Sequence, residues 1–192
     1  GGRVLLNFEG SDRVTDVWVN GEYAGSHIGG YSRFTFEITA FVRKGENTIV
    51  VRVYDDNSRD YPRGKQRWLK DNFGCWYVQT SGIYKPVWLE YVEDVYIKSI
   101  RLTPSAARGE LTVSVIPSDN EEGLSAEIVA ELDGKRMDAC ELPLYQAPND
   151  RMQQDPPVAV LKPETVRLWT AEDPVLYDLT IRLKRGGKVV DE

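Results

Sequence analysis

The side chains best suited to holding a polar, ring-shaped ligand lie between Tyr61 and Gly82, in a stretch rich in Arg, Lys, Gln, Trp and Tyr. A connection of about twenty residues is long for a compact β domain, and such loops are usually functional. Guanidinium and amide groups hydrogen-bond hydroxyls, and aromatic rings stack on flat apolar faces. Alternatively, Trp76 and Tyr77 anchor the loop to its own sandwich. The ligand-binding residues that we predict are Arg63, Lys65, Gln66, Trp68, Trp76 and Tyr77.

This chain has few candidate residues for nucleophilic catalysis, because its one histidine is His27. A Ser-His-Asp triad would need that residue, and no G-x-S-x-G turn accompanies it. Cys75 with His27 would form a thiol nucleophile, but no third group that orients the imidazole can be assigned. We therefore predict a structural role for His27, in which its imidazole hydrogen-bonds the backbone of the neighbouring loop.

Metal and cofactor binding are not predicted either. The run Asp55-Asp56-Asn57-Ser58 is rich in oxygen but lacks the spaced ligands and the glycine of a calcium loop, so it indicates a turn. The segment from Pro62 to Gln66 lacks the glycines of a phosphate-binding loop.

The bulk composition excludes several classes of protein. With 41% apolar residues in 192, the chain can bury a sizeable core, and no apolar run is long enough to span a membrane. Net charge is −6, and the densest basic cluster, at residues 63–70, is flanked by Asp60 and Asp71, so no nucleic acid partner is expected. Cys75 and Cys140 are interpreted as free thiols of a cytoplasmic protein.

The elements that must position the loop are strands. Sixteen of the twenty aromatic residues precede residue 94, which predicts two β domains, 1–93 and 94–192. Little helix is expected, and Asn20-Gly21, Asp133-Gly134 and Gly186-Gly187 predict hairpin turns. A long loop is predicted at residues 142–157. The predicted strands are 4–8, 16–19, 34–38, 48–53, 87–91, 96–102, 111–115, 126–132 and 176–183.

Three segments carry a resemblance to a known family. The hairpin WVNGEYAGSHIGG at residues 18–30 leads into YSRFTFEIT, and TSGIY at residues 80–84 leads into VWLE. Farther along, Leu168-Trp169 precedes Glu172, Pro174, Leu176 and Tyr177. Together these segments resemble glycoside hydrolase family 2, which includes β-galactosidases, β-glucuronidases and β-mannosidases.

The resemblance implies an all-β chain, with a truncated sugar-binding jelly roll followed by an immunoglobulin-like β-sandwich. The family's catalytic barrel, which carries both catalytic glutamates, would be absent, so no catalytic residue is predicted here. Asn120-Glu121 imitates part of the acid/base motif but sits in the polar turn SDNEEG. In the family, the loop corresponding to 61–82 lines the substrate pocket. Galactosidases and glucuronidases have an aspartate where this chain has Trp76, which puts transfer of their sugar specificity in doubt.

The function expected is therefore that of a non-catalytic accessory fragment, whose parent is a retaining hydrolase of β-linked sugars, broadly β-galactosidase-like. The partner would be carbohydrate, bound through the parent enzyme. A stand-alone carbohydrate-binding or adhesive β-sandwich protein is the alternative. Because strands upstream of Arg3 would be missing, we also expect self-association.

Overall fold

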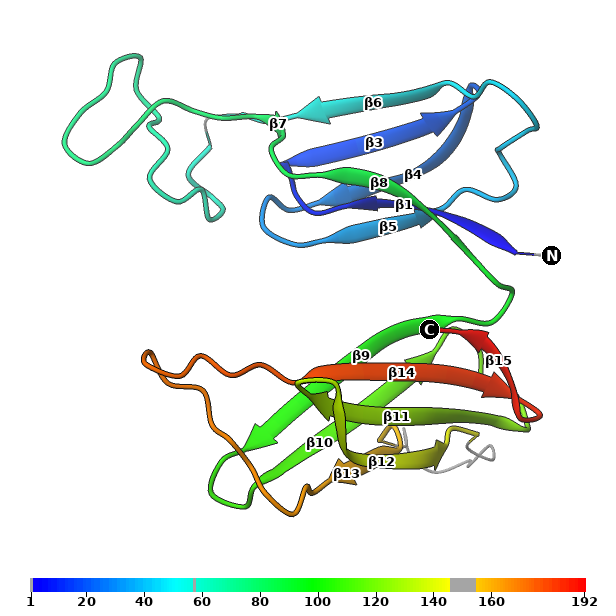
Figure 1. The fold of residues 1–192 in the computed structure, drawn as a ribbon. Coiled ribbons are helices and arrows are strands. Elements are labelled where there is room, and N and C mark those ends of the chain that lie inside the picture. Colours follow the sequence, from blue (N-terminus) through cyan, green and yellow to red (C-terminus); the bar gives the residue numbers. More distant parts are fainter. Residues whose placement is uncertain (1, 57, 146–154) are drawn as a thin grey trace. The chain divides into compact units, whose positions relative to one another are not determined.

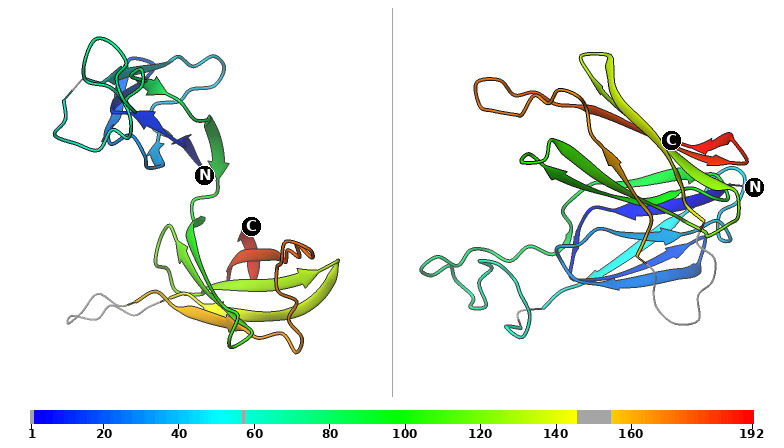
Figure 2. Two further views of the ribbon diagram at one scale, coloured as in Figure 1. Left: turned by 90° about the vertical axis from the view of Figure 1, so that its left-hand side faces the viewer. Right: turned by 90° about the horizontal axis from the view of Figure 1, so that it is seen from below.

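Strands are the regular secondary structure of the described part of the chain. The computed structural model describes residues 2–56, 58–145 and 155–192, and these contain no helix, so none that could cross a membrane. The chain divides into two units, Gly1–Val92 and Glu93–Glu192. Figures 1 and 2 show the strands of each unit in separate layers. The predicted all-β architecture is confirmed.

The first unit has two main three-stranded sheets. One has the order β5-β1-β8 and the other the order β4-β3-β6 (Figure 1). The short strands β2 and β7 form a separate pair. Neighbouring strands are antiparallel. The strands are β1 (Arg3–Phe8), β2 (Ser11–Asp12), β3 (Val14–Val19), β4 (Glu22–Ile28), β5 (Phe34–Glu37), β6 (Ile49–Tyr54), β7 (Gly82–Ile83) and β8 (Val87–Val92).

The core of this unit lies between the two main sheets. Leu6 and Phe8 of β1 meet Val17 and Val19 of β3, and each is at most 2% exposed. Alternation of side chains along a strand places these residues on the inner faces. The ring of Phe34 on β5 stacks on Phe8 with centroids 4.8 Å apart. Part of the aromatic richness noted in the sequence is therefore core packing.

The second unit is a sandwich of two sheets, with the orders β13-β10-β9 and β12-β11-β14-β15. On β11 every second residue is buried, as expected of a strand with one face on the core. Val113 and Val115 of β10 pack into the same cluster as Ile128 and Leu183. The strands are β9 (Ile97–Ser105), β10 (Glu110–Pro117), β11 (Leu124–Leu132), β12 (Lys135–Pro143), β13 (Val158–Leu161), β14 (Asp178–Arg185) and β15 (Lys188–Asp191).

The sequence misplaced two elements of this unit. The strand predicted at 176–183 begins at Asp178, because Leu176 and Tyr177 belong to the irregular segment before β14. Part of the loop predicted at 142–157 is strand, since β12 continues to Pro143. Residues 146–154 lie outside the described residues.

Asn20 and Gly21 form the turn of the β3–β4 hairpin, with positive φ values of 53° and 89°. The Asn20 amide also joins this turn to neighbouring segments. Its Nδ2 donates to Phe41 O at 2.9 Å and to Asn47 Oδ1 at 2.8 Å, and its Oδ1 accepts the Thr48 N–H at 3.0 Å. Asn20 therefore fixes both the turn and the start of β6.

We predict that Asn20→Ala lowers the free energy of unfolding by about 2–3 kcal/mol, since three hydrogen bonds of a half-buried amide are lost. The matched control is Asp133→Ala, which changes a hairpin residue with φ 52° whose side chain is 80% exposed. That control should cost about 1 kcal/mol or less. Urea unfolding followed by far-UV circular dichroism measures both, and equal costs would contradict the role given to the Asn20 amide.

Candidate functional site

The connection between β6 and β7 forms the most prominent loop of the first unit. It runs from Asp55 to Ser81 and extends beyond the ends of the strands, as Figure 1 and the right-hand view of Figure 2 show. Backbone hydrogen bonds fold the loop on itself: Arg67 N–H donates to Tyr77 O at 2.6 Å, and Tyr77 N–H to Lys65 O at 2.8 Å. The loop thus has a defined fold of its own.

Three aromatic rings form a small cluster inside this loop. Trp68 meets Trp76 edge-on with centroids 4.6 Å apart and Phe73 with centroids 5.0 Å apart. The guanidinium of Arg59 lies 5.3 Å from the Trp68 ring centroid. Trp68 and Trp76 thus pack against each other, and each is half-buried. Their contacts hold the loop to itself, whereas the sequence alternative had Trp76 anchored to the sandwich.

A buried ion pair fixes the root of the loop. The Arg63 side chain is 7% exposed, and its Nη2 lies 3.5 Å from Asp55 Oδ2, on a side chain that is 3% exposed. Asp55 Oδ2 also accepts the Ser81 hydroxyl at 2.9 Å, which joins the two ends of the loop. Arg63 Nη1 donates to the Asp56 carbonyl. These contacts give Arg63 a structural task in this chain.

Gln66 has a similar task. Its Nε2 donates to Asp12 Oδ2 at 3.0 Å, and its Oε1 accepts the Thr80 N–H at 2.9 Å. Of the six predicted residues, Lys65 and Tyr77 have exposed side chains, and Tyr77 is 60% exposed. The structure brings all six into one loop. Their contact with a ligand stays a prediction.

A pocket of about 350 Å³, with several polar side chains in its wall, lies beside the root of the loop. Sequence reasoning missed most of its residues, which come from the β2–β3 corner, the turn after β4 and the start of the loop. The G-G-Y turn was the available signal. A Cβ at Gly30 would lie 2.5 Å from Asp12 Oδ1, so any larger residue there would displace the Asp12 side chain. The pocket is lined by Asp12, Arg13, Gly29, Gly30, Tyr31, Ser32, Tyr61 and Pro62.

Charged groups organise this pocket. The Arg13 guanidinium lies 3.4 Å from the Tyr61 ring centroid, and the Tyr61 hydroxyl donates to Asp56 Oδ1. That hydrogen bond holds the pKa of Asp56 below its ordinary value. Burial, followed by the nearby Asp12 carboxylate, raises the pKa of Tyr31. At neutral pH the pocket therefore presents neutral hydroxyl groups beside one cation and one carboxylate, a set that hydrogen-bonds polyhydroxylated ligands.

The pairing of β2 with β7 brings the two ends of the site together. Asp12 lies opposite Gly82, so the S-G-I-Y segment meets the corner that carries the pocket. The Tyr84 hydroxyl then donates to Gly30 O, which braces the glycine turn. The glycine turn after β4 and the S-G-I-Y segment, more than fifty residues apart in the sequence, are thereby in direct contact.

The structure gives the remaining candidate residues other partners. Glu121 of the Asn-Glu dipeptide pairs with Arg185, with Nε and Oε2 3.2 Å apart. Cys75 and Cys140 are free thiols in different units. Within residues 2–56, 58–145 and 155–192, no cluster of His, Cys, Asp or Glu could hold a metal ion. Asn57 of the oxygen-rich run lies outside these ranges.

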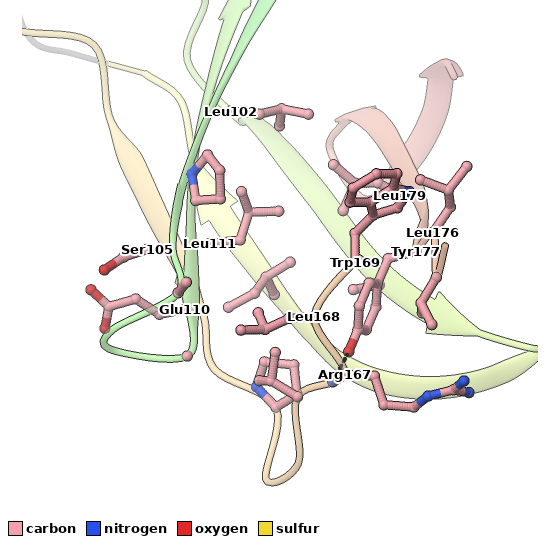
Figure 3. A pocket seen from close by; sticks show the side chains of 18 residues that line it. Leu102, Ser105, Glu110, Leu111, Arg167, Leu168, Trp169, Leu176, Tyr177 and Leu179 are labelled. Atoms are coloured by element: carbon pink, nitrogen blue, oxygen red, sulfur yellow. Dashed lines mark hydrogen bonds between the residues drawn. The ribbon is translucent and has the colours of Figure 1, made fainter. Parts of the chain in front are cut away.

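A second concave surface, of about 510 Å³, lies at one end of the second unit (Figure 3). Its wall is mostly apolar and includes Leu102, Leu111, Leu168, Trp169 and Leu176, so it offers little to a polar ligand. The Tyr177 hydroxyl accepts the Arg167 N–H at 2.9 Å and closes one side. The segment from Leu168 to Tyr177, which carries part of the family resemblance, thus lines an apolar groove.

Comparison with known proteins settles the family. The family model "Glycosyl hydrolases family 2, sugar binding domain" matches residues 1–92, and "Glycosyl hydrolases family 2" matches residues 91–192. The chain belongs to glycosyl hydrolase family 2. The resemblance inferred from three motifs is confirmed.

The relatives that this chain matches are longer proteins. It is 29% identical to a β-galactosidase of Thermoanaerobacter pseudethanolicus, over 100% of this chain and 25% of that protein. It is 31% identical to a putative β-glucuronidase of Formosa agariphila, over 97% of this chain and 21% of that protein. A putative β-galactosidase structure from Bacteroides fragilis matches with a TM-score of 0.74 and 25% identity, over 100% of this chain and 29% of that one. The chain thus spans about a quarter of these relatives.

His27 ties the glycine turn to the core. Its ring stacks on Phe34 with centroids 4.0 Å apart, and its Nε2 lies 3.1 Å from Ser32 Oγ. The hydrogen bond was predicted with the loop backbone, whereas the 3.1 Å contact of Nε2 is with the Ser32 side chain of the turn. Burial lowers the pKa of the imidazole below its ordinary value.

We predict that the first unit loses stability as pH falls below about 6.5, the pKa of an unfolded histidine. The unfolded chain then binds a proton that the native chain excludes, so the free energy of unfolding falls until the lower native pKa is reached. His27→Gln removes this dependence, and because His27 is the one histidine, no other imidazole masks it. Urea unfolding between pH 7.5 and 5.5 tests this; identical pH dependence in both proteins would contradict it.

Proposed function

We propose that this chain is the carbohydrate-binding, non-catalytic part of a family 2 glycosidase that hydrolyses β-linked sugars such as β-galactosides. One observation carries the proposal. The β6–β7 loop is prefolded and presents Lys65 and Tyr77 to solvent on the same unit as the pocket of Asp12 and Arg13. An aromatic ring with adjacent cationic and hydroxyl groups suits a sugar, which has both an apolar C–H face and polar hydroxyls.

The hydrolytic carboxyl groups would lie elsewhere in the intact enzyme. A retaining glycosidase needs two carboxyl groups about 5–5.5 Å apart, one protonated and one ionised. The carboxylates at the pocket have other tasks: Asp12 accepts Gln66 Nε2, and Asp56 accepts the Tyr61 hydroxyl. This chain would contribute one wall of the substrate site, and the sugar would be a galactoside, a glucuronide or a relative that Trp76 accommodates.

Both curated relatives named above support this substrate class, since their names specify a β-galactosidase and a putative β-glucuronidase. The position of Trp76 separates this chain from the galactosidases and glucuronidases that the sequence resembles. Because Trp76 packs on Trp68, it shapes the loop, and the exposed Tyr77 beside it is the ring available for stacking.

We predict that Tyr77→Ala and Lys65→Ala, in the longer polypeptide that includes a catalytic domain, each lower kcat/KM roughly tenfold, the effect of losing about 1.4 kcal/mol of transition-state stabilisation. Leu69→Ala is the matched control: it lies in the same loop, is 53% exposed, and should leave kcat/KM unchanged. Arg63→Ala should instead lower the unfolding midpoint, since it leaves the buried Asp55 carboxylate unpaired.

The isolated chain provides the complementary measurement. It should not hydrolyse nitrophenyl β-glycosides, and calorimetric titration with the matching sugars should show weak or undetectable binding, since small ligands need most of their surface buried. Turnover that co-purifies with the chain would overturn the proposal. Tight binding without turnover would establish a stand-alone carbohydrate-binding protein instead.

A further inference from the structure

The turn between β3 and β4 contains the one asparagine of the sequence that is followed directly by glycine, Asn20-Gly21. Such a pair is prone to a spontaneous reaction. The backbone nitrogen of the glycine attacks the side-chain carbon Cγ of the asparagine and closes a succinimide ring. The proton that this nitrogen loses is returned to the leaving amide, which departs as ammonia, and water then opens the ring to aspartate or isoaspartate. Glycine favours the attack because no Cβ crowds its nitrogen.

Hydrogen bonds hold the Asn20 side chain away from this reaction. Ring closure needs the side chain, and the backbone that follows it, to rotate until Cγ meets Gly21 N. The amide is tied at both ends: its Nδ2 donates to Phe41 O at 2.9 Å and to Asn47 Oδ1 at 2.8 Å, and its Oδ1 accepts the Thr48 N–H at 3.0 Å. The Asn20 backbone N–H also donates to Thr48 O, at 2.8 Å. The three side-chain hydrogen bonds must therefore break before the ring can close.

Asn47, which accepts one of these hydrogen bonds, is itself held in place. Its Oδ1 accepts the Arg43 N–H at 2.9 Å, and its Nδ2 donates to Arg43 O at 2.8 Å and to Gly45 O at 3.0 Å. The Asn47 amide thus folds the connection between β5 and β6 around itself. Because this acceptor is already ordered, the hydrogen bond from Asn20 costs little further conformational entropy.

A second hairpin of the chain has a similar backbone conformation but a more weakly held side chain. In the β11–β12 turn, Asp133 and Gly134 have φ values of 52° and 74°, against 53° and 89° for Asn20 and Gly21. The Asp133 side chain is 80% exposed, and its carboxylate lies 3.4 Å from Arg167 Nη1. A difference in reactivity between asparagines at these two positions therefore reports the hydrogen bonds of the side chain.

We propose that Asn20-Gly21 is a deamidation site that the fold keeps closed, and that it reacts when the β3–β4 turn opens locally. The reaction prevents the native turn from forming again. It replaces the Nδ2 donor by a carboxylate oxygen, which would face two other acceptors, Phe41 O and Asn47 Oδ1. Two hydrogen bonds become repulsive contacts, and isoaspartate also lengthens the backbone of the turn by one carbon. Local opening is thereby recorded as a permanent chemical change.

The variant Asp133→Asn tests the proposal within one molecule, because it creates a second Asn-Gly turn and asparagine tolerates positive φ. The purified chain is incubated in mildly alkaline buffer, and peptide mapping by mass spectrometry measures conversion at both positions, relative to the same chain in urea. We expect position 133 to react at least roughly tenfold faster than Asn20, since each closed hydrogen bond must first open. Equal rates would show that the turn conformation alone protects both positions, and would overturn the proposal.

The variant Asn47→Ala removes one acceptor of the Asn20 amide and should raise the rate at Asn20 roughly tenfold. Val17→Ala is the matched control, since it truncates a fully buried core residue of the same unit that contacts none of these groups by hydrogen bonds. Circular dichroism confirms that both variants are folded, and urea unfolding compares their stabilities. Equal acceleration by both changes at equal loss of stability, or none by Asn47→Ala, would contradict the proposal.

The consequence of the reaction is tested with Asn20→Asp, which is one of its products. This variant should unfold at a lower urea concentration than the unchanged chain, because its carboxylate faces the Phe41 and Asn47 oxygens. An unchanged midpoint would contradict the permanent loss of the native turn.

Discussion

The candidate site depends on one buried ion pair. Ionised groups taken out of water are costly unless they are paired, and Arg63 and Asp55 each leave less than a tenth of their side chain exposed. Asp55 also accepts the hydroxyl of Ser81, so the same carboxylate holds both ends of the β6–β7 loop. The aromatic cluster farther out and the exposed Tyr77 are positioned by this root. Loss of either charge would leave its partner buried and uncompensated.

A continuous stack of rings links the pocket to the core. Phe8, fully buried in β1, stacks on Phe34, which in turn stacks on His27. His27 then contacts Ser32, a residue of the pocket wall. The glycine turn that shapes the pocket is therefore supported by the hydrophobic interior, and the hydroxyl of Tyr84, in the connection between β7 and β8, donates to the Gly30 carbonyl of the turn. Rigid support of this kind is what an oriented polar site requires.

Local chemistry made much of the fold predictable, and long-range contacts made the rest inaccessible. Asn20-Gly21 could be identified because few residues adopt positive φ, and alternation revealed most strands. The short β13 and the late start of β14 carry no such signal. The loop was found by its length, but the burial of Arg63 was not, because a charged residue among other charges resembles a solvated surface. Asp12, Arg13 and Tyr31 meet Tyr61 only once the strands have paired, so the glycine turn was the one part of the pocket that the sequence signalled.

The closed root of the β6–β7 loop has an evolutionary consequence. Ser81 and Asp55 join its ends, and Trp68, Phe73 and Trp76 pack together inside it, so many of the contacts that shape the loop are its own. Loop-closure entropy changes slowly with length, so insertions and deletions between these anchors cost little. Ligand preference can then change through substitutions, insertions or deletions in the β6–β7 loop alone, while the two sheets of the first unit stay the same.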